Sequence, residues 1–343
     1  MAASTIKPDE VILFFHTCAW RAPDAPDTWV LPIRGIVFEP EADSRVRDAF
    51  LRRLRDYLGL SDTQATSTLY QERARPFVVD HERGKRLAIR LGGRTLTLPP
   101  SGADGHFAGE LRLRDAEVRP LFESPTESNP WVPYQAVTAR PDRRVFAGAV
   151  QLLKPEGLSV VSDIDDTMKV SHCLDRARLL DGMFLRDFRA VDGMPALYAR
   201  WAAQGAAFHY VSAGIWQFYE PLAAFCATAG FPRGSMHLQP FRIADGTADD
   251  AFEFPERKKR GVLAELLRNY PRRRFLLVGD SGQKDPELYA ELARAHPDQV
   301  QRVLIRDITN EPAEADRYRT AFEGLPRDRW QIFREAREID GAL

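Results

Sequence analysis

Three carboxylates and a threonine follow an apolar run near the middle of the chain. Residues 160–167 read VVSDIDDT, so Asp163, Asp165 and Thr167 come shortly after a β-branched segment. A run of this kind predicts a buried parallel strand, and ligands of open α/β sheets bind beyond the carboxyl ends of such strands. Crowded carboxylates raise one another's pKa unless a cation compensates them, and ligands that are all oxygen favour a hard cation. The cluster therefore predicts a Mg²⁺ site.

Two other interpretations apply to an acidic turn. Asp and Thr are ordinary turn residues, so a structural turn without a ligand is one alternative. A calcium loop of the EF-hand type is the other, and it requires a glycine at its sixth position and a bidentate glutamate at its twelfth. This chain has Met168 and Leu174 at those positions, which excludes the calcium loop.

A later apolar run also ends in groups that suit phosphate chemistry. Residues 208–211 read FHYV and predict another buried strand. Ser212, Ala213 and Gly214 follow directly. They offer a hydroxyl and a glycine-opened backbone, which are suited to hydrogen bonds with phosphate oxygens.

Two more charged segments follow in order. Residues 275–278 read FLLV and lead into a glycine-rich turn that carries Asp280 and Asp285. Before them, the basic run RKKR at 257–260 opens a predicted helix. The apolar positions of that helix recur at helical spacing and are Leu263, Leu266 and Leu267. One cation of the basic run is able to bridge a nucleophile and a phosphate, whereas the others are interpreted as a solvated helix start.

The order of these motifs resembles that of a known enzyme superfamily. Asp-x-Asp-x-Thr, a serine after a strand, a lysine and then Gly-Asp-x-x-x-x-Asp are similar to the four motifs of the haloacid-dehalogenase-like phosphohydrolases. Within that superfamily, the chain resembles the catalytic domain of the actin-patch phosphatidate phosphatase family. The segments that carry this resemblance are 162–167, 210–217, 279–289 and 305–307. It covers roughly the C-terminal half of the chain.

The resemblance implies a chemical role for each acid. Asp163 attacks phosphorus and becomes an aspartyl phosphate, while Asp165 protonates the leaving alkoxide and then activates the hydrolytic water. Mg²⁺ is held by Asp163, Asp280 and the backbone carbonyl of Asp165. Asp285 supports the metal waters or the catalytic lysine.

The resemblance also implies the substrate contacts. Ser212 and the amides after it, Ala213 and Gly214, bind phosphate oxygens, and Lys259 stabilises developing charge. Lys259 is preferred to Lys258 because it stands four residues before Leu263, at the helix start where the family has its lysine. The predicted substrate-binding set is Thr167, Ala213, Gly214 and Trp216.

The tetrapeptide GDSG at 279–282 also surrounds the nucleophile of chymotrypsin-like proteases. That mechanism requires a histidine base and an oriented carboxylate. His16 is the nearest candidate base, and it lacks the sequence context of that family. An apolar strand before the tetrapeptide and a helix after it are typical of an α/β enzyme, so we reject the protease interpretation.

Composition predicts a globular protein of two domains. The 343 residues exceed the usual size of one core, and a hydrophobic content of 44% is ordinary. The 48 basic and 49 acidic residues give a formal net charge of -1, so no global field favours nucleic acid. Three scattered cysteines predict reduced thiols and a cytoplasmic protein, with any peripheral membrane contact local. No apolar run approaches the ~20 residues of a membrane span, and the N-terminus does not resemble a signal peptide.

The sequence changes character near residue 155. Residues 1–154 predict a β-rich domain with one helix over 41–58 and a hairpin that turns at Gly92 and Gly93. Further strands are predicted over 107–113 and 145–153, and a loop over 124–133. Residues 155–343 predict the alternating strands and helices of a doubly wound parallel sheet with a minimal cap, as in the haloacid-dehalogenase-like enzymes.

These features together predict a Mg²⁺-dependent phosphohydrolase, with phosphatidate as the substrate that the resemblance implies. The alternatives are a phosphatase of a soluble or protein phosphomonoester and a catalytically idle module that binds lipid or phosphoprotein. Trp216, Phe218 and Tyr219 are predicted to form an apolar lip beside an open site, or otherwise to start a packed helix. The arginines predicted either to hold anionic headgroups or to be solvated are Arg176, Arg178, Arg186 and Arg189.

Overall fold

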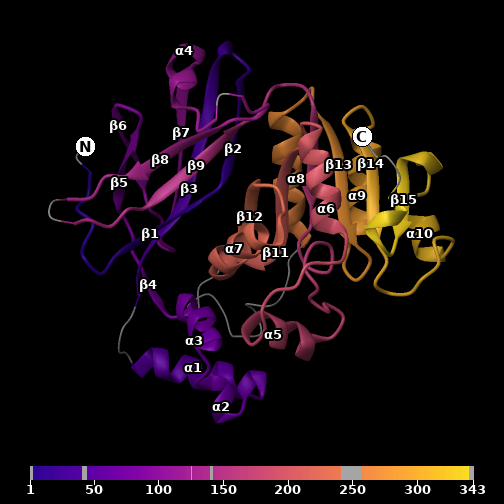
Figure 1. Ribbon diagram of the computed structural model, residues 1–343, viewed down its shortest axis with the longest axis horizontal. Coiled ribbons are helices and arrows are strands. Elements are labelled where there is room, and N and C mark those ends of the chain that lie inside the picture. The colour runs from indigo at the N-terminus through magenta and orange to yellow at the C-terminus, as the bar shows by residue number, and fades with distance from the viewer. Residues whose placement is uncertain (1–2, 41–44, 125, 140–141, 241–255, 340–343) are drawn as a thin grey trace. The chain divides into compact units, whose positions relative to one another are not determined.

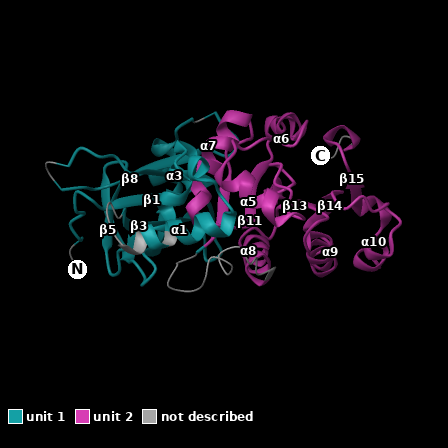
Figure 2. Ribbon diagram, turned by 90° about the horizontal axis from the view of Figure 1, so that it is seen from below, with its two compact units in different colours: residues 1–154, 240–253 teal, residues 155–239, 254–343 magenta. Residues whose placement is uncertain are grey.

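The structure is a computed structural model that describes residues 3–40, 45–124, 126–139, 142–240 and 256–339 (Figure 1). The chain divides into two compact units (Figure 2). The first unit comprises residues 1–154 with 240–253, and the second comprises residues 155–239 with 254–343. Among the described residues, no helix has both the length and the apolar character that crossing a bilayer requires.

The first unit is built mainly of strands. They are β1 (Val11–Phe15), β2 (Thr17–Ala22), β3 (Ala25–Pro40), β4 (Val79–His81), β5 (Arg86–Leu91), β6 (Arg94–Pro100), β7 (His106–Arg114), β8 (Trp131–Ala136) and β9 (Ala147–Leu152). Their order in the sheet is β1-β3-β2-β9-β8-β5-β6, and β4 and β7 also pair with β3. All of these pairings are antiparallel except that of β2 with β9. The core of the unit contains fully buried side chains such as Leu31, Ile89 and Val150.

The helices of the first unit are α1 (Arg45–Leu58), α2 (Asp62–Ala65), α3 (Thr68–Ala74) and α4 (Asp115–Val118). The predicted hairpin and the strands over 107–113 and 145–153 are confirmed. The helix predicted over 41–58 is confirmed from Arg45 onward, and its first four residues lie outside the described residues. The prediction of a single helix is wrong, because helices of four to seven residues leave too little apolar periodicity to recognise.

Proline and glycine conceal two strands of this unit. The predicted loop over 124–133 is wrong at its end, since β8 begins at Trp131. Pro133 is tolerated there because β8 pairs with β5 only through Gln135 and Ala136. Likewise, sequence patterns do not reveal the long β3, because Pro32 and other turn-forming residues interrupt it.

The second unit alternates strands and helices. Its strands are β10 (Leu158–Ser162), β11 (Ala207–Ile215), β12 (Ser235–Gln239), β13 (Arg274–Asp280), β14 (Val300–Arg306) and β15 (Trp330–Phe333). Its helices are α5 (Arg176–Phe184), α6 (Met194–Ala203), α7 (Tyr219–Ala229), α8 (Glu256–Asn269), α9 (Asp285–Ala295) and α10 (Asp316–Ala321). The strand order is β12-β11-β10-β13-β14-β15, and every neighbouring pair is parallel. The predicted α/β character with a parallel sheet is therefore confirmed.

The sheet of the second unit is covered on both faces. Figure 2 shows α6 and α7 on one side of the strands and α8, α9 and α10 on the other. This explains the continuous apolar runs of β10 and β13, in which Val160, Leu277 and Val278 are almost fully buried. Helix boundaries follow local signals: α9 has Pro286 in its first turn, and α7 is followed by a cap at Gly230, which adopts a left-handed φ of 83°.

The strand order brings three motifs to one edge of the sheet. β10 lies between β11 and β13, and the register aligns Ser162 with Tyr210 on one side and with Val278 on the other. Because the strands are parallel, the residues that follow them emerge side by side at their carboxyl ends. Asp163, Ser212 and Asp280 are thereby brought together although they are far apart in the sequence.

Candidate active site

A buried lysine joins two of the predicted acids. The Lys259 Nζ atom donates to Asp163 Oδ1 at 2.8 Å and to Asp285 Oδ1 at 2.5 Å. Asp163 follows β10, Lys259 lies in the first turns of α8, and Asp285 begins α9, and all three side chains are at most 4% exposed. Burial alone would lower the pKa of Lys259, but the two carboxylates outweigh it and raise that pKa well above its ordinary value. The lysine is therefore a permanent cation.

Asp280 completes a group of three buried acids. Carboxylate oxygens of Asp163, Asp280 and Asp285 lie within 4.8 Å of one another. Burial, and then the neighbouring carboxylates, raise the pKa of Asp163 well above its ordinary value against the opposing effect of Lys259. The same causes raise the pKa of Asp280 to about 7. One lysine does not neutralise three carboxylates, so the cluster favours a further cation.

Two oxygens of this group are available to such a cation. Asp163 Oδ2 and Asp280 Oδ2 are buried and have no hydrogen-bond partner among the described residues. The other oxygens of these side chains are engaged: Asp163 Oδ1 by Lys259, and Asp280 Oδ1 by the backbone N–H groups of Gly282 and Gln283 at 2.6 and 3.2 Å. Unpartnered carboxylate oxygens that converge in a buried site fit a hard divalent cation such as Mg²⁺.

Asp165 has a different environment from Asp163. Its carboxylate pairs with Lys169 at 2.8 Å and accepts hydrogen bonds from Ser171 at 2.6 Å and Ser212 at 3.3 Å. Burial alone would raise the pKa of Asp165, but the Lys169 ammonium and these hydrogen bonds outweigh it and hold the pKa below its ordinary value. Sequence reasoning missed Lys169, although its position four residues after Asp165 was an available signal.

The loop after Asp165 is fixed by Asp166. The carboxylate of Asp166 accepts backbone N–H groups from Ser171, His172 and Cys173 at 2.8, 3.0 and 2.6 Å. Asp166 itself has a φ of 53°, a left-handed conformation that Asp tolerates better than most residues. These bonds close the loop on itself and keep Lys169 beside Asp165.

The Ser212 segment belongs to β11 rather than to a loop after it. The register between β11 and β12 shifts between Val211 and Ile215, so the three residues Ser212, Ala213 and Gly214 leave the regular ladder. Gly214 donates its N–H to Ser212 Oγ at 2.9 Å, and Ser212 donates to Asp165. Such irregularities turn backbone groups toward a site.

Three residues of the predicted substrate-binding set, Thr167, Ala213 and Trp216, are buried. Thr167 is fully buried, and its Oγ1 has no partner in the described part of the chain. Trp216, Phe218 and Tyr219 are at most 5% exposed, so the predicted apolar lip is wrong. These residues form a 3-10 turn and the start of α7, and Phe218 packs edge to face against Phe184 at 5.4 Å. The alternative of a packed helix start describes them correctly.

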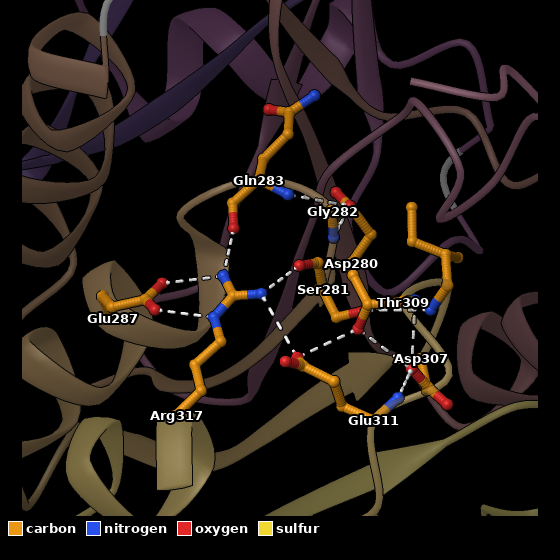
Figure 3. Close-up of polar contacts among 10 residues, drawn as sticks. Asp280, Ser281, Gly282, Gln283, Glu287, Asp307, Thr309, Glu311 and Arg317 are labelled. Carbon is orange, nitrogen blue, oxygen red and sulfur yellow. Dashed lines mark hydrogen bonds and ion pairs between the residues drawn. The ribbon is translucent and has the colours of Figure 1, made fainter. Parts of the chain in front are cut away.

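A polar network holds the Asp280 loop from outside the site (Figure 3). Arg317, on α10, donates to the backbone carbonyls of Ser281 and Gln283, the latter at 2.5 Å, and pairs with Glu287 at 2.8 Å. Ser281 Oγ in turn accepts the backbone N–H groups of Ile308 and Thr309 at 2.9 and 3.2 Å. Sequence reasoning missed Arg317, because nothing near it in the sequence indicates this contact.

Comparison with known proteins covers the same segment. Residues 158–307 match the family described as the catalytic domain of phosphatidate phosphatase APP1. An uncharacterized protein of Schizosaccharomyces pombe is 27% identical over 172 residues, or 49% of this chain and 28% of that protein. Phosphatidate phosphatase APP1 of Saccharomyces cerevisiae is 30% identical over 162 residues, or 46% of this chain and 27% of that protein. The chain therefore spans little more than a quarter of either relative.

The similarity to solved structures is too weak to support a conclusion about the fold. A sialyltransferase from Photobacterium damsela aligns with 65% of this chain and 37% of its own, at 9% identity and a TM-score of 0.21. By contrast, the family match from 158 to 307 contains every predicted acid together with Ser212 and Lys259.

We expect Mg²⁺ to raise the thermal stability of the protein more at pH 8 than at pH 6. Burial and neighbouring carboxylates raise the pKa of Asp280 from 3.8 to about 7. Because folding raises the pKa of this carboxyl group, its contribution to the stability of the folded protein is lost as the pH rises through the folded-state pKa. The ionised carboxylate, which then forms, is the species that binds metal. A cation at a hundred times its Kd contributes about 2.7 kcal/mol. Melting temperatures with and without Mg²⁺ at both pH values measure the effect. An equal gain at the two pH values, or a full gain in Asp280→Asn, would contradict it.

We expect Arg317→Ala to raise the Mg²⁺ concentration needed for half of this stabilisation by about tenfold, which corresponds to about 1.4 kcal/mol. The reason is that the loop carrying Asp280 loses the guanidinium group that donates to the backbone carbonyls of Ser281 and Gln283. Arg319→Ala is the matched control, since Arg319 lies on the same helix and pairs only with the exposed Asp316 in the described structure. Equal Mg²⁺ titrations for the two variants would show that Arg317 does not position the loop.

Proposed function

Because residues 158–307 belong to the catalytic-domain family of phosphatidate phosphatase APP1, we propose that this chain is a Mg²⁺-dependent phosphatase that converts phosphatidate to diacylglycerol and phosphate. The observation that carries the proposal is the buried junction of Asp163, Lys259 and Asp285 beside Asp280, all within the matched segment. The motif resemblance to this family is confirmed by the match.

The second unit is assigned in this proposal to the doubly wound, haloacid-dehalogenase-like fold with a small cap. The strand order runs outward from β10 in one direction through β11 and β12, and in the other through β13 to β15. Helices lie on both faces of the sheet (Figure 2). Both features are typical of doubly wound sheets and support the assignment. In such sheets ligands bind where the strand order reverses, which here is at β10.

Asp163 is the nucleophile in the proposed reaction. Lys259 donates to its Oδ1, and its Oδ2 has no protein partner among the described residues, so the carboxylate can offer one oxygen to a metal and the other to phosphorus. A bond forms between one carboxylate oxygen of Asp163 and phosphorus while the ester P–O bond breaks, which gives an aspartyl phosphate and an alcohol. Water then attacks phosphorus, releases phosphate and restores the carboxylate. Lys259 stabilises the negative charge that develops on the phosphoryl oxygens.

Asp165 moves the proton in both steps. It donates a proton to the leaving oxygen first and takes one from the attacking water second. The Lys169 ammonium holds the pKa of Asp165 below its ordinary value and so favours its ionised form, which the second step requires. For the first step it must receive a proton, and a phosphate monoester monoanion brings one.

Asp163, Asp280 and the backbone carbonyl of Asp165 would hold Mg²⁺, which supplies charge neutralisation and orientation of the phosphate when bound. Asp285 holds Lys259, the proposed catalytic lysine, and it would support waters on a bound metal. Ser212 and the amides of the bulged β11 segment bind phosphate oxygens.

A phosphatase of a soluble or protein phosphomonoester is the second candidate. The burial of Trp216, Phe218 and Tyr219 favours it, because the apolar lip that would have suited a lipid is missing. Phosphate release from phosphatidate in mixed micelles, from short soluble monoesters and from a phosphopeptide, each with Mg²⁺ or with EDTA, tests the proposal. Faster release from phosphatidate supports it, and a preference for soluble esters selects the second candidate.

We expect Asp163→Asn to lower turnover at least about a thousandfold, or about 4 kcal/mol of barrier, since an amide is a poor nucleophile. Turnover of phosphatidate and retention of the aspartyl-phosphate mimic beryllium fluoride are the measurements. Asp298→Asn, an exposed acid before β14, is the control and keeps full activity. Turnover of Asp163→Asn within about tenfold of wild type would overturn the mechanism.

We expect Asp165→Asn to slow phosphoenzyme formation much more for alkyl phosphates than for nitrophenyl phosphate. An alkoxide is a poor leaving group and needs the proton, whereas nitrophenolate leaves without it. Rapid-quench measurement of the phosphoenzyme with both substrates gives the comparison. Equal losses for the two leaving groups would mean that Asp165 is not the acid.

A further inference from the structure

Three hollows adjoin on the second unit, beside the loop that follows Asp163. Their volumes are about 430, 440 and 410 Å³. Val170 and Arg189 line all three hollows, and Arg306 lines the first two. Because the hollows share these lining residues, we treat them as one depression around Arg189 and Arg306. We call this depression the arginine groove.

Ion pairs occupy several other charges of the groove. Among the described residues, the pairs are Arg178 with Asp175, Arg186 with Asp181, Arg334 with Asp307 and Arg337 with Glu335. Arg189 and Arg306 have no carboxylate partner in that part of the chain. The groove therefore presents two guanidinium groups whose charge is not already paired.

Arg306 lines the groove and also contacts the loop that follows Asp165. Its Nη1 donates to the backbone carbonyl of Asp166 at 2.7 Å, while its buried Nε has no partner among the residues that the structure describes. Asp166 and exposed Asp187 and Asp192 also line the groove, but Asp166 is occupied by three backbone N–H groups. An arginine with unused donors is suited to a phosphate group, which accepts two parallel hydrogen bonds.

An exposed leucine lies on the wall of the same groove. Leu174 lines the second hollow and is 59% exposed. Among the described residues, Val145 of the first unit is the other exposed large apolar side chain. A leucine beside arginines is typical of a membrane contact, in which the apolar side chain enters the acyl region and the arginines meet headgroups.

We propose that the arginine groove binds the phosphodiester headgroup of an anionic membrane lipid, with Arg189 and Arg306 as donors and Leu174 inserted into the bilayer surface. The choice of a lipid as the source of the phosphate rests on the proposed function. Binding here brings the loop of Asp165 and Asp166 to the bilayer, where phosphatidate is found. The groove is distinct from the buried acids, so a diester held there is not the molecule that is hydrolysed.

Sedimentation with phosphatidylcholine vesicles, with or without phosphatidylglycerol, tests the proposal in the presence of EDTA. Phosphatidylglycerol is a diester, so the assay reports on the groove whether or not the chain hydrolyses phosphatidate. We expect the wild-type chain to bind the anionic vesicles more tightly, and Arg189→Ala to weaken that binding about fivefold. Leu174→Ser should weaken it too. Arg200→Ala, an exposed arginine of α6 outside the groove, is the matched control and should bind at least twice as tightly as Arg189→Ala.

Three outcomes would overturn the proposal. Equal binding to neutral and anionic vesicles would show that no anionic headgroup is recognised. Equal losses in Arg189→Ala and Arg200→Ala would reduce the effect to general surface charge. Displacement by inorganic phosphate, together with unchanged binding of Leu174→Ser, would assign the groove to free phosphate instead of a lipid. Circular dichroism of each variant verifies that an exposed substitution has left the fold intact.

Discussion

The ammonium of Lys259, buried between Asp163 and Asp285, is the interaction on which the second unit depends. Each partner comes from a different element, so the ion pairs join the end of β10 to the starts of α8 and α9. Removing one member would leave a buried charge without compensation, at a cost of about 3–5 kcal/mol. The same constraint explains Gly279, where a side chain would collide with the Asp285 carboxylate. The same three side chains therefore stabilise the second unit and carry the proposed chemistry.

The excess of negative charge determines what surrounds that junction. The loop that keeps Asp280 close to two other acids is held from outside, by Arg317 on the backbone carbonyls and by Ser281 through its hydroxyl (Figure 3). The contacts of Arg317 neutralise no acid of the site and instead fix the direction of the loop. Repulsion among the acids is thus retained, and it is this retained repulsion that makes a divalent cation a favourable ligand.

Sequence revealed the parts of this arrangement whose signals are local. The apolar runs of β10 and β13 predict buried parallel strands, and the acids that follow them are brought together because those strands are neighbours. Lys169 was accessible in principle from its spacing to Asp165. Arg317 was not, since the two loop carbonyls that it binds lie more than thirty residues away. For the aromatic segment at Trp216, the sequence left a lip and a packed helix start both open. Whether such residues face solvent or core depends on where the 3-10 turn after β11 directs them, which sequence does not encode locally.

One short loop connects the buried chemistry with the surface. Asp166 places its carboxylate on the N–H groups of residues 171–173 and its carbonyl on Arg306, while Asp165 beside it is paired with Lys169. Arg306 ends β14, the neighbour of the strand that carries Asp280. A charge bound in the arginine groove would therefore act on a segment that is covalently continuous with both proposed catalytic acids.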